Sequence, residues 1–147
     1  MSGHHHHRFD HATHEGNLWL RKIEENLDLQ REGDAYAALR ATLHALRDRL
    51  MPEDAVHLSA QLPLVVRGLF FEGWKMSRTP TGEDNIEQFC AHIESQLPPH
   101  FPLNSRSLAR GVFEVMWSEL DAGEISKVIE RLPHALRTLW PTPRIRT

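Results

Sequence analysis

An internal similarity constrains this fold more than any other feature of the sequence. When the chain is shifted by 70 positions, residues 17–70 align without a gap onto residues 87–140. Nine of the 54 aligned pairs are identical, and the similar pairs fall on the apolar positions. They include Trp19 with Phe89, Ile23 with Ile93, Leu27 with Leu97, Leu50 with Leu120, and Leu62-Pro63 with Leu132-Pro133. Similarity at one fixed offset indicates a repeated structural unit, so we expect the same unit twice.

Each half has the apolar spacing of four helices. In the first half, Tyr36, Leu39, Leu43, Leu46 and Leu50 follow a 3-4-3-4 spacing, which places one apolar stripe on one helix face. Prolines then separate the elements, because a proline lacks the N–H that a helix interior needs. The predicted helices are 18–27, 35–50, 52–62 and 64–71 in the first half, and 85–97, 106–119, 121–132 and 133–140 in the second. We predict no strands, since no segment alternates polar and apolar residues.

The predicted fold is all-α, with two tandem pseudo-repeats of about four helices each that pack into one bundle-like domain. Because half of so short a chain makes a marginal core alone, the two leucine-rich halves should bury their stripes against each other. The predicted boundaries are a flexible His-rich tail at 1–15, repeats at 16–74 and 85–141, a linker at 75–84, and a C-terminal tail at 142–147.

Composition excludes several classes of protein. The chain has 147 residues with a formal net charge of −3, from 17 basic and 20 acidic residues, so we do not expect broad electrostatic capture of nucleic acid. Its one cysteine cannot close an internal disulfide. No apolar run approaches the ~20 residues that span a bilayer, and no secretory signal is evident. We therefore expect a cytoplasmic protein that does not enter membranes.

The N-terminal histidines have two interpretations. His4, His5, His6 and His7 follow Met-Ser-Gly, which is the pattern of an affinity tag or its remnant. If they are native, neutral imidazoles there could bind a metal such as zinc or nickel. We expect no metal site and no cofactor in the folded part, where no His-Glu-x-x-His pair or Gly-rich phosphate loop occurs.

Several motifs together resemble one bacterial family. They are Phe9-Asp10, Asn17-Leu-Trp-Leu20, the stretch 38–50, Ala60-Gln-Leu-Pro63, the stretch 67–74, Gly123-Glu124 and Leu139-Trp140-Pro141. On these residues, about 9–141 of the chain is similar to the family called domain of unknown function 2267. The resemblance implies a small all-helical cytoplasmic protein. It supplies no assigned reaction and therefore no catalytic residue.

Four arginines coincide in the alignment of the halves: Arg40 with Arg110, and Arg67 with Arg137. One interpretation is structural, with each guanidinium bonding a carboxylate or the open carbonyls at a helix end. The other is an anion site, in which the arginines and a helix N-terminus hold phosphate or a carboxylate. The sequence leaves both open.

Two aromatic residues have no equivalent in the second half. Phe71 and Trp74 lie beside Gly73 and the linker. They could pack inside the molecule, or they could form a surface for a protein partner or a second copy of the chain, since exposed apolar patches and tryptophans mark interaction sites.

The sequence favours a non-enzymatic interaction or regulatory protein, with a stress-related role as one hypothesis. We expect a protein partner or a homodimer. One alternative is a small-molecule or anion-binding protein with a pocket between the halves, and another is a helical nucleic-acid-binding protein. The acidic balance of the chain argues against the last.

Overall fold

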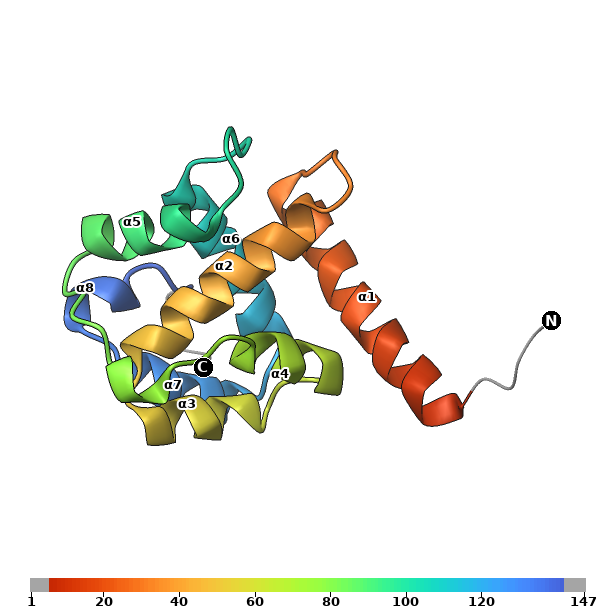
Figure 1. Ribbon diagram of the computed structural model, residues 1–147, viewed down its shortest axis with the longest axis horizontal. Coiled ribbons are helices and arrows are strands. Elements are labelled where there is room, and N and C mark those ends of the chain that lie inside the picture. The colour runs from red at the N-terminus through yellow and green to blue at the C-terminus, as the bar shows by residue number, and fades with distance from the viewer. Residues whose placement is uncertain (1–5, 142–147) are drawn as a thin grey trace, which may run out of the picture.

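The apolar stripes of the sequence all lie in helices. The computed structural model describes residues 6–141, and this range contains helices and no strand. The helices are α1 (His7–Leu27), α2 (Asp34–Arg49), α3 (Pro52–Ser59), α4 (Leu64–Phe71), α5 (Ile86–Gln96), α6 (Ser105–Glu119), α7 (Ala122–Glu130) and α8 (His134–Arg137), with a short 3₁₀ helix η1 (Met76–Arg78) before α5. Figure 1 shows one helical body with α2 across its middle and the start of α1 projecting from it. The predicted all-α class is confirmed. No helix in this range is both long and apolar enough to cross a bilayer.

Short polar residues and prolines set the helix starts. Asn85, Asn104 and Asp121 each accept a hydrogen bond from the backbone N–H three residues on, which satisfies one donor at the starts of α5, α6 and α7. Pro52 occupies the first turn of α3, where its missing N–H costs nothing. Gly33 precedes α2 with φ 87°, a left-handed conformation that favours glycine.

Helix α1 is longer than the sequence predicted. Residues 7–15, assigned above to a flexible tail, are helical, and Asn17 lies inside α1 rather than capping it. The cause is packing against α4. Ala12 and Gly16 are buried, and a Cβ on Gly16 would lie 3.3 Å from Val65 Cγ1. A His-rich sequence gives no local sign of such a tertiary contact.

The core joins the two halves. Leu43 and Leu46 of α2 and Val112 and Met116 of α6 are all completely buried in one continuous apolar cluster. Helix α1 packs against α6, α5 against α2, and α3 against α7, so every one of these contacts pairs one half with the other. The predicted burial of the leucine stripes in one helical domain is confirmed.

Each half of the described chain contains four α-helices, α1–α4 in the first and α5–α8 in the second. The fourth helices of the two halves differ in length: α4 has eight residues and α8 has four. Whether one half is a copy of the other stays a prediction from the sequence.

Candidate functional site

An apolar groove lies between α1 and α4 and is floored by α2. Its volume is about 360 Å³. Gly16 and Leu20 of α1 face Val65 and Leu69 of α4 across it, and Leu39 of α2 lies beneath them. Gly16 matters because it has no side chain, which lets the Val65 side chain of α4 pack directly against α1.

The rim of the groove is more exposed and more polar than its floor. Val65 is 48% exposed and Tyr36 is 46% exposed, so two large apolar side chains of the lining remain half in water. Leu64, next to the groove on α4, is 58% exposed. At one end, Arg40 Nε donates to Glu72 Oε1 over 3.0 Å, which places one ion pair on the rim. The groove therefore offers apolar contact area with a single charged pair at its edge.

Two of the four predicted arginines complete helix ends. Arg67 donates to the carbonyls of Ser59 and Leu62, at the end of α3. Arg137 donates to the carbonyls of Glu130 and Leu132, at the end of α7. These carbonyls lie at or just beyond the last turn of each helix, where intrahelical partners run out, and the guanidinium groups bond them. The Ser59 carbonyl also accepts from the Leu62 backbone N–H.

The other two arginines lie apart from these. Arg40 is engaged by Glu72 at the rim of the groove. Arg110 is exposed on α6 and forms no hydrogen bond or ion pair with any residue in the range 6–141. The groove between α1 and α4 contains none of the four guanidinium groups among its lining residues. The structure therefore does not bring the four arginines together in this groove.

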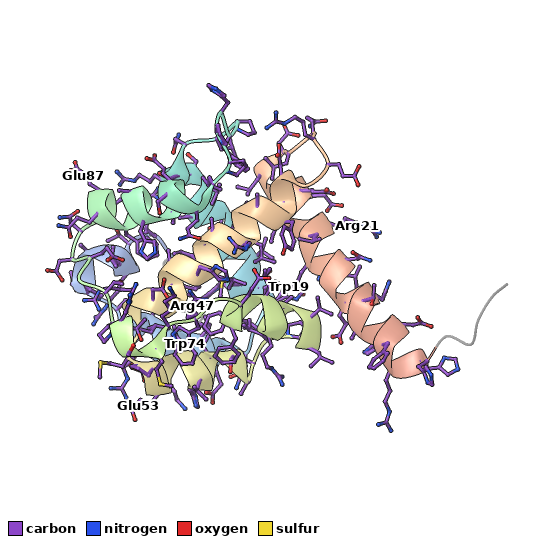
Figure 2. The ribbon with its side chains drawn as sticks, viewed as in Figure 1. Trp19, Arg21, Arg47, Glu53, Trp74 and Glu87 are labelled. Atoms are coloured by element: carbon purple, nitrogen blue, oxygen red, sulfur yellow. The ribbon has the colours of Figure 1, made fainter. Side chains whose placement is uncertain are left out.

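The predicted aromatic residues lie against the core. Phe71 and Trp74 are both half-buried, with ring centroids 5.2 Å apart, and Phe70 lies 5.3 Å from Phe71 on its other side. The indole N–H of Trp74 is buried and has no hydrogen-bond partner. Figure 2 shows Trp74 within the body of the molecule, while Arg21 points away from it. Part of each aromatic ring remains available at the surface.

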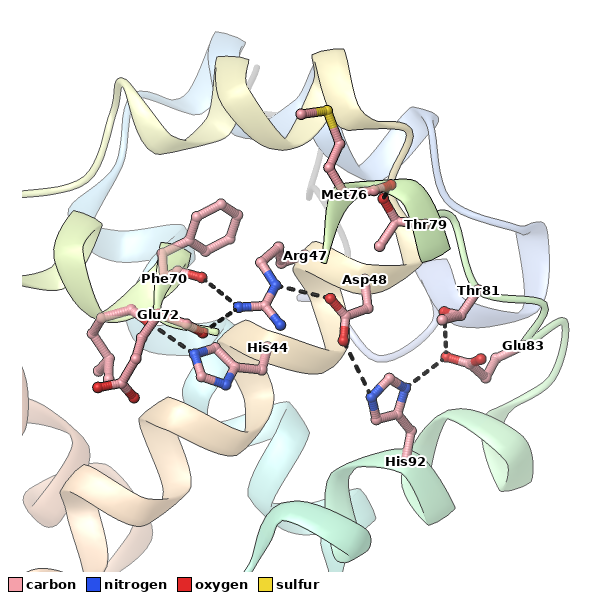
Figure 3. Close-up of polar contacts among 11 residues, drawn as sticks. His44, Arg47, Asp48, Phe70, Glu72, Met76, Thr79, Thr81, Glu83 and His92 are labelled. Carbon is pink, nitrogen blue, oxygen red and sulfur yellow. Dashed lines mark hydrogen bonds and ion pairs between the residues drawn. The ribbon is translucent and has the colours of Figure 1, made fainter. Parts of the chain in front are cut away.

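A largely buried polar network occupies the junction of α2, the end of α4 and the linker (Figure 3). Its centre is Arg47, whose side chain is 5% exposed. Arg47 donates to Asp48 Oδ1 over 2.8 Å and to the carbonyls of Phe70 and Glu72 over 3.0 and 2.8 Å. Asp48 Oδ2 in turn lies 3.5 Å from His92 Nε2 on α5. The network therefore joins the two halves of the chain.

The network also shifts the titration of its members. The hydrogen bond with Asp48 raises the pKa of His92, against the opposing effect of burial, and Glu83 raises it further. Burial alone would raise the pKa of Asp48, but hydrogen bonds from His92 and Arg47 outweigh it and the pKa is lowered. Burial lowers the pKa of His44, which binds the Leu69 carbonyl and lies near Arg47.

The described residues offer little to covalent or metal chemistry. Burial raises the pKa of the Cys90 thiol, which disfavours the reactive thiolate. In residues 6–141 there is no cluster of three His, Cys, Asp or Glu side chains that could hold a metal ion. Of the N-terminal histidines, His6 and His7 are exposed at the start of α1, and His4 and His5 lie outside the described residues.

Sequence reasoning missed both the groove and the network. Tyr36 belongs to a predicted apolar stripe and Val65 to the predicted helix 64–71, and only tertiary packing shows that both stay exposed. Asp48 and His92 are far apart in the chain, and nothing local connects them. One signal was available: at the offset of 70 they align with Ser118 and Lys22, so neither is shared by the two halves.

Comparison with known proteins gives one result. A family model described as an uncharacterized conserved protein, DUF2267, matches residues 16–139. No curated protein matches the chain.

Proposed function

The chain belongs to the DUF2267 family of uncharacterized conserved proteins, and from this premise we propose that it is a non-enzymatic interaction protein whose α1–α4 groove binds an amphipathic helix of a protein partner. The observation that supports this is the exposed apolar surface on the α4 wall of the groove and on the adjoining part of α2. Val65 and Leu64 on α4 and Tyr36 on α2 each leave about half of their surface in water. Exposed apolar surface of this kind is typical of interaction sites.

A helix suits the groove in shape. The lining residues of α1 run from Thr13 to Leu20 and those of α4 from Val65 to Glu72, which is about two turns on each wall. A groove between two helices accepts the apolar face of a third through side chains spaced three and four residues apart. Beside Gly16 the Val65 side chain already occupies the space where a Cβ would lie, so the apolar side chains of a partner would sit elsewhere along the groove.

The rim favours a partner with mixed charge. Glu72 and Arg40 form one ion pair there, and both remain partly exposed. A partner cation near Glu72 or a partner anion near Arg40 would be steered by these groups without being buried. We infer a cytoplasmic location as well, because Cys90, the single cysteine, is a buried free thiol.

The test compares two matched valines. Val65→Glu places a charge in the groove, and Val56→Glu places the same charge on α3, where Val56 is 52% exposed and lies outside the groove. Partner capture from the native host and the mass from light scattering are measured for both variants and the natural protein. We expect a captured protein, or a mass above that of the monomer, that survives Val56→Glu and disappears with Val65→Glu. Equal behaviour of the two variants would remove the groove from the proposal.

We do not propose the anion-binding alternative, because no observation favours it. Arg40, Arg67 and Arg137 each donate to groups within the fold, and nothing brings them together with Arg110. The nucleic-acid alternative is likewise not proposed, since acidic residues outnumber basic ones in the chain.

A further inference from the structure

We infer that a proton holds the linker between the two halves in place: protonated His92, set between Asp48 of α2 and Glu83 of the linker, fastens residues 81–84 to the body, and neutral His92 lets them loosen. This latch, defined as Asp48, Glu83 and His92, is independent of the function proposed for the groove.

The linker is fastened at few points. The Thr81 backbone N–H donates to the Asp48 carbonyl over 2.7 Å, and Arg49 Nε donates to the Glu83 carbonyl over 2.6 Å. The Thr81 hydroxyl donates to Glu83 Oε1 over 2.9 Å, so the same carboxylate is held from within the linker. Figure 3 shows the Thr81–Glu83 bond beside the contact between Glu83 and His92.

His92 bridges the two carboxylates of the latch. Its Nδ1 lies 2.9 Å from Glu83 Oε1, and its Nε2 lies 3.5 Å from Asp48 Oδ2. Only the protonated ring has a donor on both nitrogens, whereas the neutral ring turns one lone pair toward a carboxylate. All three side chains are between 15% and 17% exposed, so water and salt screen the interaction only in part. Loss of the proton therefore removes the cation that lies between Asp48 and Glu83, while the bonds from Arg47 to Asp48 and from the Thr81 hydroxyl to Glu83 remain.

The other charged groups on the helices that pack near His92 interact with carboxylates, with Cys90 or with backbone carbonyls, and not with the His92 ring. From α2, Arg47 donates to Asp48 and Arg49 lies 3.6 Å from Asp84, so both cations favour ionised carboxylates. From α6, Arg106 acts on Cys90. From α8, Arg137 bonds carbonyls at the end of α7. Among the described contacts, Asp48 and Glu83 alone face the His92 ring.

The direction of the effect follows from linkage. The hydrogen bond with Asp48 raises the pKa of His92 in the folded protein, and Glu83 adds to it. In an open linker the ring loses Glu83, so its pKa falls toward the ordinary value. A group whose pKa is higher in the closed state stabilises that state below the open-state pKa, and the stabilisation is lost as pH rises through the closed-state pKa. The latch is thus closed in mild acid and weakened in mild alkali.

The latch also connects to the end of α4. Asp48 is bonded to Arg47, and Arg47 holds the carbonyls of Phe70 and Glu72. Titration of His92 therefore acts on the electrostatic surroundings of the segment that precedes the linker.

The test measures hydrogen exchange at the Thr81 amide by NMR, expressed as a protection factor so that the intrinsic pH dependence of exchange is removed. We expect protection to fall as pH rises, with a midpoint that coincides with the titration of the His92 ring followed by its own NMR signals. The total fall should be about tenfold for each unit of pKa difference between closed and open states. A Thr81 protection factor that stays constant through the His92 titration would overturn the inference.

Two variants separate the latch from a general effect of pH. His92→Gln should abolish the pH dependence at Thr81, whereas His57→Gln should keep it, because His57 is 55% exposed and pairs with one carboxylate, Glu124, on the opposite α3–α7 side. If His92→Gln does not fold, Glu83→Gln serves instead and should reduce the pH dependence by removing one carboxylate. An unchanged dependence in the variant that is used would refute the latch.

Discussion

Replacement of Arg47 by methionine should be the most costly single change in the polar network. Methionine keeps much of the apolar stem but removes every donor. The side chain is 5% exposed and makes three hydrogen bonds, two of them to backbone carbonyls at the end of α4. Water cannot easily replace the guanidinium at such a buried position, so its former partners stay unsatisfied.

The magnitude follows from the number and burial of these bonds. Each buried acceptor that loses its partner costs roughly 1–3 kcal/mol, and Asp48 also loses a cation on its Oδ1. Removing one partner of a buried ion pair generally costs about 3–5 kcal/mol. The carbonyls of Phe70 and Glu72 can regain some hydration, so we expect a loss of about 3–5 kcal/mol in the free energy of unfolding rather than the full sum.

Arg40→Met is the matched control. Arg40 also lies on α2, but its side chain is 35% exposed and it forms one exposed ion pair with Glu72. Such pairs contribute about 0–1 kcal/mol. Urea unfolding followed by far-UV circular dichroism measures both variants against the natural protein. If Arg47→Met costs no more than Arg40→Met, the network does not stabilise the fold in the way described.

Three further changes test other parts of the molecule. Leu43→Ala should cost about 2–5 kcal/mol because Leu43 is completely buried, whereas Val56→Ala, at a residue 52% exposed, should change urea stability by under about 0.5 kcal/mol. Asp48→Asn should lower the free energy of unfolding at about pH 7. The difference from the natural protein should shrink as pH falls through the lowered pKa of Asp48, because the natural carboxyl is then also neutral. Urea unfolding at about pH 7 and at a pH below that pKa measures this. Trp74→Ala should lower the melting temperature without changing the mass in light scattering, since Trp74 packs on Phe71 and the core.

The fold was largely predictable because its information is local and periodic. The stripe of Leu43 and Leu46 required a buried helix face, and Pro52 marked a helix start that the structure confirms. The start of α1 was not predictable. Helix α1 packs there through Gly16 against Val65, two residues 49 positions apart, and no local pattern reports such a contact.

The candidate site was less predictable, for a physical reason. Apolar periodicity shows that Val65 belongs to a helix, but exposure depends on what the rest of the chain leaves uncovered. One of the two interpretations of the arginines, that a guanidinium bonds open carbonyls at a helix end, describes the bonds that Arg67 and Arg137 make. The network of Asp48 and His92 unites residues 44 positions apart, so composition and spacing carried no sign of it.

A comparison of the halves separates packing from individual roles. The capping arginines occupy aligned positions and make equivalent bonds to the ends of α3 and α7, as expected of a requirement that any such helix pair has. The groove and the latch use residues without an equivalent. Tyr36 and Val65 align with Arg106 and Ala135, and His92 aligns with Lys22, which pairs with Glu119 instead. Only nine of the 54 aligned pairs are identical, so the lack of an equivalent does not by itself mark a functional residue. The exposure of Val65 and Tyr36 is what makes the groove a place where changes should affect what the protein does before they affect whether it folds.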